Sequence, residues 1–162
     1  MFQLFLFLHV MGAIAVFGPT FVFPILASHV KKTPQHGNFA ARVGEFIEMR
    51  LVLPGAIVQG ITGVVLILLS GRDLTQAANR WLVAAIILYL IAIGFAAMVQ
   101  AKNVKHMVEL TANMPPGPPP AGAPAGPPPE IAETGRKLER GGQLLTVLIV
   151  AIVALMVVKP GV

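Results

Sequence analysis

The sequence predicts an all-α integral membrane protein, a four-helix bundle that forms one domain over residues 1–162. Of its 162 residues, 56% are hydrophobic and only 12% are charged, and the mean hydropathy is +0.78. Soluble domains carry roughly 25% charged residues, so this composition favours a bilayer environment. Four apolar stretches separated by polar segments predict spans at residues 2–27, 51–69, 81–99 and 144–158.

The first span has no formal charge, and His9 is its only ionisable side chain. A secretory signal peptide is the competing interpretation. No Lys or Arg precedes the apolar run, however, and the run is longer than a signal peptide needs. Residues 2–27 are therefore expected to cross the membrane as a helix, with an imidazole that needs a partner.

The second span follows an amphipathic stretch. Residues 38–50 repeat apolar side chains at helical spacing, which predicts a helix lying near the lipid headgroups and leading into the span. Glu45 and Glu48 are interpreted as solvated, with a catalytic use as the alternative. Pro54 donates no backbone hydrogen bond, so the first turns should bend or loosen. Small and polar residues then predict a surface for close helix packing: Gln59, Gly60, Thr62 and Gly63.

The third span begins at Trp81, where interfacial aromatic residues are typical, and Ala92 and Ala96 form a small-residue pair suited to packing. Its helix is expected to continue to about Leu110. Residues 115–129 contain only Pro, Gly and Ala, which predicts an extended spacer, with a docking motif as the alternative.

The fourth span is short. A helix is expected to restart after Pro129, and residues 144–158 then cross the membrane with Lys159 extending their reach. The first and third loops hold nine Lys and Arg residues, against three elsewhere. Because cytoplasmic loops carry the excess of positive charge, both termini are predicted outside and the Pro-rich loop in the cytoplasm. This orientation explains the net charge of +5 without nucleic acid.

The residue inventory excludes several functions. There is no Cys, which removes disulfides, thiolate metal sites and thiol catalysis. The sequence has no Gly-rich phosphate loop, no Ser/His/Asp set and no cluster with metal-ligand spacing. His29, His36 and His106 lie in polar segments and are expected to be ordinary exposed histidines.

The predicted orientation places His9 about two helical turns below the outer face. Basic residues at the ends of other spans lie at the same face, among them Arg80 and Lys159. A cofactor with anionic groups could be bound by His9 below and by Arg80 or Lys159 at its rim. The alternative is that these bases only anchor helix ends.

Short motifs carry a resemblance to a known family. They are residues 8–13 with the aromatic and proline residues that follow, residues 48–51 ahead of Pro54-Gly55, and residues 157–160. The sequence resembles small integral membrane proteins related to HemJ-type protoporphyrinogen oxidase and to the membrane domain of copper-resistance protein D. Within that set it is most similar to an uncharacterised bacterial family, which implies the bacterial inner membrane.

The resemblance implies that His9 binds haem b. In HemJ-like proteins a Trp opens the third span and is followed by His and Lys residues needed for activity. Residues 80–85 of this chain contain Trp81 but neither of the others. The oxidase reaction is therefore not expected, and an enzymatic role is left open.

Three functions follow for a multi-pass membrane protein of this kind. The first is a haem protein that uses His9 as a ligand. The alternative is a non-catalytic subunit or scaffold of a larger membrane complex, or a homo-oligomer, without a cofactor. A less favoured hypothesis is copper tolerance or transport through His9 and Met11, an imidazole and a soft thioether that would face different sides of a helix.

Overall fold

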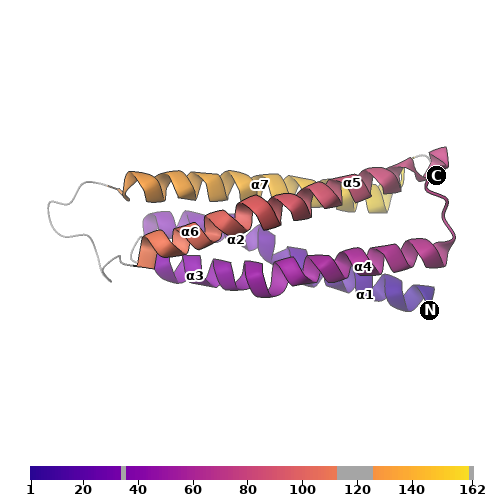
Figure 1. Cartoon of the computed structure of the whole chain (residues 1–162), viewed down its shortest axis with the longest axis horizontal. Coiled ribbons are helices and arrows are strands. Elements are labelled where there is room, and N and C mark those ends of the chain that lie inside the picture. The colour runs from indigo at the N-terminus through magenta and orange to yellow at the C-terminus, as the bar shows by residue number, and fades with distance from the viewer. Residues whose placement is uncertain (34–35, 113–125, 161–162) are drawn as a thin grey trace.

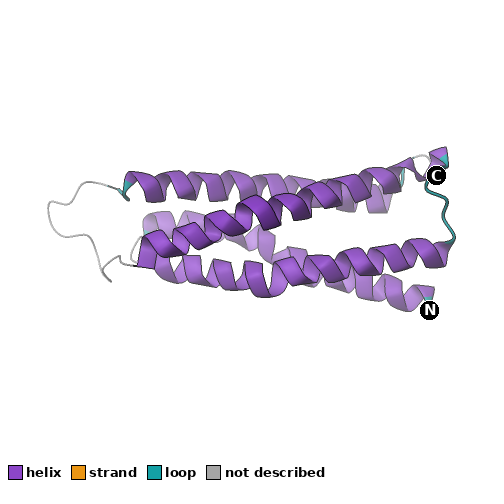
Figure 2. Ribbon diagram, viewed as in Figure 1, coloured by secondary structure: helices purple, strands orange, loops and turns teal. Residues whose placement is uncertain are grey.

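The computed structural model describes residues 1–33, 36–112 and 126–160. Over these ranges the chain forms four long helical rods that run antiparallel to their neighbours in sequence (Figure 1), and none of the described residues is in a strand (Figure 2). Each rod is long and apolar enough to cross a membrane. The predicted all-α four-span architecture is therefore confirmed.

Three rods consist of two α-helices joined by a short irregular turn. The first contains α1 (Phe2–Phe17), a 3₁₀ turn (Gly18–Phe21) and α2 (Val22–Lys32). The second contains α3 (Gly37–Ile47), a π-helical turn (Glu48–Val52) and α4 (Leu53–Ser70). The third opens with a 3₁₀ turn (Ala77–Asn79) and contains α5 (Arg80–Phe95), a π-helical turn (Ala96–Gln100) and α6 (Ala101–Ala112). The fourth is the uninterrupted helix α7 (Pro129–Val158).

Two of the irregular turns lie beside a proline. Pro19 lies in the first turn of the 3₁₀ segment, and Pro54 lies in the first turn of α4, directly after the π-helical turn. A proline inside a helix removes one hydrogen bond and crowds the preceding turn, which a wider π-turn relieves. The loosening predicted at Pro54 is thus present as Glu48–Val52. No proline is near Ala96–Gln100, and the sequence does not account for that turn.

The two ends of the bundle differ. The terminal end, where both termini and residues 71–79 lie (Figure 1), is built from two helix pairs, α1 with α4 and α5 with α7. At the opposite end, α2, α3, α6 and the first half of α7 pack side by side in a ring. We call this the basic end, after its positively charged side chains: Arg42, Lys102, Lys105, Arg136, Lys137 and Arg140.

The central packing joins α5 to α7. Ala92 and Ala96 are buried against Leu145, and larger apolar side chains surround them: Leu53, Phe95 and Leu148. Alanine at both positions lets the two helix backbones approach closely. This confirms the predicted small-residue pair on the third span.

Residues 38–50 form the helix that was predicted to lead into the second span. α3 runs on through the π-helical turn into α4, and it packs against α6. Asn38 at the start of α3 donates a hydrogen bond of 3.0 Å to the Thr111 hydroxyl near the end of α6. The rod therefore extends beyond the predicted span 51–69, and its exposed positions include the apolar Phe39 and Phe46 as well as Arg42.

The fourth span is likewise part of a longer helix, since α7 begins at Pro129. Proline suits this position because the first helical residues need no donor. Residues 115–125 of the predicted Pro-rich spacer lie outside the described residues. The third rod reaches Ala112, close to the predicted end at Leu110.

Two helical glycines provide a matched test of the packing. A methyl group at Gly55 would overlap Val16 of α1, whereas one at Gly44 would have no neighbour within 4 Å. We expect Gly55→Ala to lower the unfolding free energy in detergent by about 1–3 kcal/mol through overpacking. Gly44→Ala should instead raise it slightly, because Ala favours helix more than Gly. Equal effects of the two changes would contradict the α1–α4 contact.

Candidate functional site

The His9 side chain of α1 is half-buried against α4. Its Nδ1 atom lies 2.8 Å from the Thr62 hydroxyl oxygen. Gly63 makes this approach possible, because a Cβ there would lie only 3.3 Å from the imidazole Cε1. The imidazole of His9 therefore packs against the small and polar surface that was predicted on the second span.

The hydrogen bonds around Thr62 define the state of the imidazole. The Thr62 hydroxyl donates its single proton to the Gln59 carbonyl oxygen at 3.0 Å. With its proton on that carbonyl, the hydroxyl accepts a hydrogen bond from His9 in the tautomer that carries the ring proton on Nδ1. The lone pair is then on Nε2, which is the nitrogen that a metal would bind.

A second contact fixes the backbone at this position. The Gln59 amide donates a hydrogen bond of 2.8 Å to the His9 carbonyl oxygen. Gly12, one turn further along α1, lies over the same amide, and a Cβ there would be 2.6 Å from Gln59 Oε1. Gln59 is itself buried. Both the side chain and the backbone of His9 are thus tied to α4.

Arg80 and Lys159 lie at the terminal end, on the other helix pair. Arg80 is the first residue of α5, and Lys159 follows the last residue of α7. Both are exposed, and Lys159 adopts a left-handed conformation with φ of 46° as it ends its helix. The fold brings these two bases to one end of the α5–α7 pair, whereas His9 contacts α4 of the facing pair.

The remaining charges of the terminal end have structural partners. The Arg72 guanidinium lies 5.7 Å from the ring centroid of Trp81 and donates a 3.2 Å hydrogen bond to Asn79. The backbone N–H and hydroxyl of Thr75 both donate to the Asp73 carboxylate, which lowers the pKa of Asp73. Trp81 is buried in the first turn of α5, at the start of the third span, as the sequence predicted for its position in the chain.

Two polar residues are buried that the sequence did not indicate as buried, and one of them, Gln100, was not a candidate at all. Glu48 is 2% exposed and Gln100 is 7% exposed, and each lies in one of the π-helical turns. Their Oε1 atoms have no hydrogen-bond partner among the described residues. Glu48 was interpreted as solvated, and its burial contradicts that interpretation. The physical reason is packing, because the π-helical turn that carries Glu48 contacts α1 of the first rod.

Glu48 and Gln100 lie at the same level of the bundle. The hydrogen bond between Asn38 and Thr111 fixes the register of the second rod against the third at one point. Ala56 and Tyr89 mark another, because the Tyr89 hydroxyl donates a 2.5 Å hydrogen bond to the Ala56 carbonyl. In this antiparallel register Gln100 falls opposite Glu48.

The described part of the chain does not gather acidic and histidine side chains into a metal centre. The described residues contain no group of three or more His, Cys, Asp or Glu side chains that could hold an ion. Met11 is exposed on α1, while His9 is half-buried. The pair proposed for copper therefore gains no further ligands from the fold.

The family of the chain is identified by a match over residues 3–160 to the family described as predicted integral membrane protein (DUF2269). The chain belongs to this family and is an integral, multi-pass membrane protein. No curated protein and no solved structure matches it. The more distant relationship to HemJ-type and copper-resistance proteins stays a prediction, as does the bacterial inner membrane.

The burial of Glu48 generates a stability prediction. Replacing a buried carboxyl that lacks a partner with an apolar side chain of similar size removes a desolvation penalty. We expect Glu48→Met to raise the unfolding free energy in detergent by about 1–4 kcal/mol. Glu109→Met is the control, because Glu109 is 79% exposed and should change little. A large destabilisation by Glu48→Met would show that the carboxyl makes contacts the fold requires.

Proposed function

We propose that this chain is a membrane haem protein in which His9 Nε2 is an axial ligand of haem b. The observation that carries the proposal is the arrangement Gln59 carbonyl–Thr62 hydroxyl–His9 Nδ1, which leaves Nε2 as the free nitrogen. Histidine ligands of metals almost always donate their other N–H to an acceptor in this way. The arrangement also fixes the ring orientation before a ligand binds.

The lone position of His9 favours a porphyrin over a bare ion. A bare metal needs three or four protein ligands, which the described residues do not group together. A porphyrin supplies four nitrogen ligands itself, so one histidine is enough to hold its iron. A site with one histidine ligand therefore favours haem over copper.

The charges of the terminal end suit the other part of the cofactor. Haem b has two propionates, which are anionic and prefer the membrane surface. Arg80 and Lys159 lie at the terminal end on the helix pair that faces α1 and α4. Each could form a charge-assisted hydrogen bond with a propionate.

When bound, the haem would supply one-electron chemistry. The protein would contribute the axial imidazole, whose basicity the Thr62 hydroxyl would increase by accepting a hydrogen bond from Nδ1–H. Residues 80–85 at the start of α5 contain neither His nor Lys. The proposed role is therefore binding and electron transfer, not the oxidation attributed to HemJ-type proteins.

An absorption spectrum tests the ligand directly. Protein purified from cells supplied with a haem precursor should show a Soret band, and His9→Ala should lose it. His29→Ala is the matched control and should retain it, since His29 is exposed. The Gln59 bond to the His9 backbone survives the substitution, so helical content should be unchanged. Wild-type protein without Soret absorption would refute the proposal.

Thr62→Val tests the orienting hydrogen bond. Valine keeps the shape of threonine but cannot accept a hydrogen bond from Nδ1–H. The imidazole would therefore lose its preferred orientation. We expect the haem dissociation constant to rise about 10–100-fold, as for other outer partners of metal ligands. Thr146→Val on α7 is the control, because Thr146 bonds only within its own helix. An unchanged haem dissociation constant in Thr62→Val would contradict the assignment of His9 as the axial ligand.

The double variant Arg80→Gln/Lys159→Gln tests the propionate contacts. Loss of both charges should weaken haem retention while leaving the position of the Soret band unchanged, because the axial ligand remains. The control Lys102→Gln/Lys105→Gln removes the same charge from the basic end. Equal retention in all three proteins would show that Arg80 and Lys159 only anchor helix ends.

A further inference from the structure

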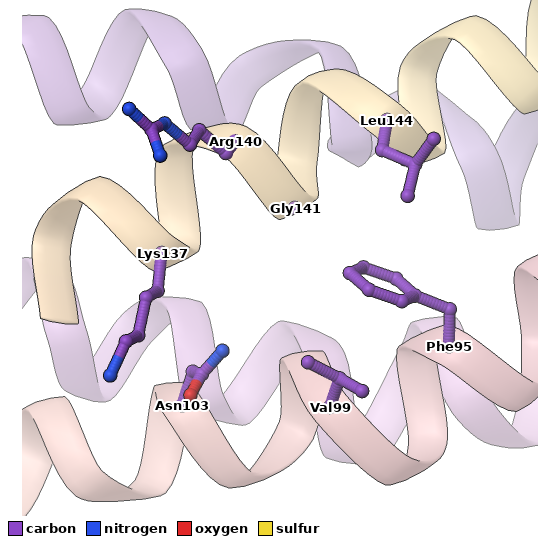
Figure 3. Close-up of a pocket in the computed structure, with 7 residues that line it drawn as sticks. All are labelled: Phe95, Val99, Asn103, Lys137, Arg140, Gly141 and Leu144. Carbon is purple, nitrogen blue, oxygen red and sulfur yellow. The ribbon is translucent and has the colours of Figure 1, made fainter.

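A groove lies between the third and fourth rods, remote from His9. It has a volume of about 480 Å³ and opens to the surface. Figure 3 shows the side chains that line it, which come from α5, the π-helical turn, α6 and α7: Phe95, Val99, Asn103, Lys137, Arg140, Gly141 and Leu144.

The lining is divided into a polar and an apolar half. Asn103, Lys137 and Arg140 lie toward the basic end, whereas Phe95 and Leu144 lie on the side of the apolar spans. Figure 3 shows the Phe95 ring pointing into the space between the helices, with Lys137 and Asn103 at the other side. The division arises because antiparallel α6 and α7 both change from polar to apolar at this level.

Gly141 allows the Gln100 side chain to pack directly against α7 beside the groove. It is buried, and a Cβ there would overlap the side-chain amide of Gln100 and lie 3.3 Å from Phe95 Cε1. Gln100 is held in place by a 3.1 Å hydrogen bond from its amide to the Leu138 carbonyl. The wall of α7 therefore has no side chain of its own at this point.

We propose that the groove binds one anionic phospholipid from the leaflet at the basic end. Lys137, Arg140 and Asn103 would contact the headgroup phosphate, and an acyl chain would lie along Phe95, Val99 and Leu144. Basic pockets between membrane helices on the cytoplasmic side recognise such headgroups. A free phosphate would use only the polar half. The choline of phosphatidylcholine would add a positive charge beside the phosphate, so a headgroup with a net negative charge fits Lys137 and Arg140 better.

One of the cations already has a partner. Lys137 Nζ lies 2.8 Å from Glu133 Oε1, in a pair whose side chains are 57% and 59% exposed. Such exposed pairs contribute little to stability, so the lysine can change partners at small cost. Glu133→Gln should consequently strengthen lipid retention, because it removes a competitor for Lys137.

Native mass spectrometry can measure this retention. The protein is released from nanodiscs that contain equal amounts of phosphatidylglycerol and phosphatidylcholine with the same acyl chains. Wild-type protein should keep one phosphatidylglycerol in preference, and Lys137→Gln/Arg140→Gln should keep at least fivefold less. The control Lys102→Gln/Arg136→Gln removes the same charge from exposed residues outside the groove, and it should retain lipid like the wild type.

A second variant tests the shape of the site without changing its charge. Val99→Trp should fill the apolar half and lower retention to the level of the double variant. Inorganic phosphate at millimolar concentration should not displace the lipid. The proposal is overturned if both lipids are retained equally, if the control loses as much as the double variant, if Val99→Trp has no effect, or if phosphate displaces the lipid.

Discussion

The contact between α1 and α4 is the interaction on which the account of this protein depends. Inside a bilayer, polar groups must find partners within the protein. His9 meets this requirement through Thr62, and the Gln59 amide meets it through the His9 carbonyl. Gly12 and Gly63 permit the close approach that both bonds need. The same contacts attach the first rod to the bundle and set the direction of the imidazole.

The polar side chains of the bundle form separate groups along its long axis. His9, Gln59, Thr62 and Tyr89 form contacts in the half near the termini, where the helices are grouped as two pairs. Glu48 and Gln100 are buried near the middle, at the π-helical turns. π-turns inside α-helices are frequent at functional sites, which makes this middle level a second region of interest. The basic end then carries a group of exposed positive side chains, among them Arg42, Lys102 and Arg140.

The sequence was sufficient to predict the architecture, and it singled out His9 as a polar residue inside a span that needs a partner. Long apolar stretches define the four spans, and a single histidine within one of them stands out because ionisable groups are costly in lipid. The packing role of Ala92 and Ala96 was equally accessible, since their spacing places both on one helix face.

The partners of these residues could not be predicted. Thr62 is 53 positions from His9, and only the register of α1 against α4 brings the two together. Glu48 lies among charged neighbours, so its burial depends on the π-helical turn and on the packing of α3 against α6. Gln100 was unremarkable in sequence for the same reason. Local patterns predicted the helices, whereas long-range register determined which polar groups are buried.

The most direct test of the haem proposal is to identify the nitrogen that binds the iron. The chain has four histidines, and substituting His29, His36 and His106 with Gln leaves only His9. This variant, labelled with ¹⁵N-histidine and loaded with haem, can be studied by pulsed electron paramagnetic resonance. A ¹⁵N hyperfine coupling from one axial imidazole is the predicted result. A bound haem without that coupling would contradict the assignment of His9.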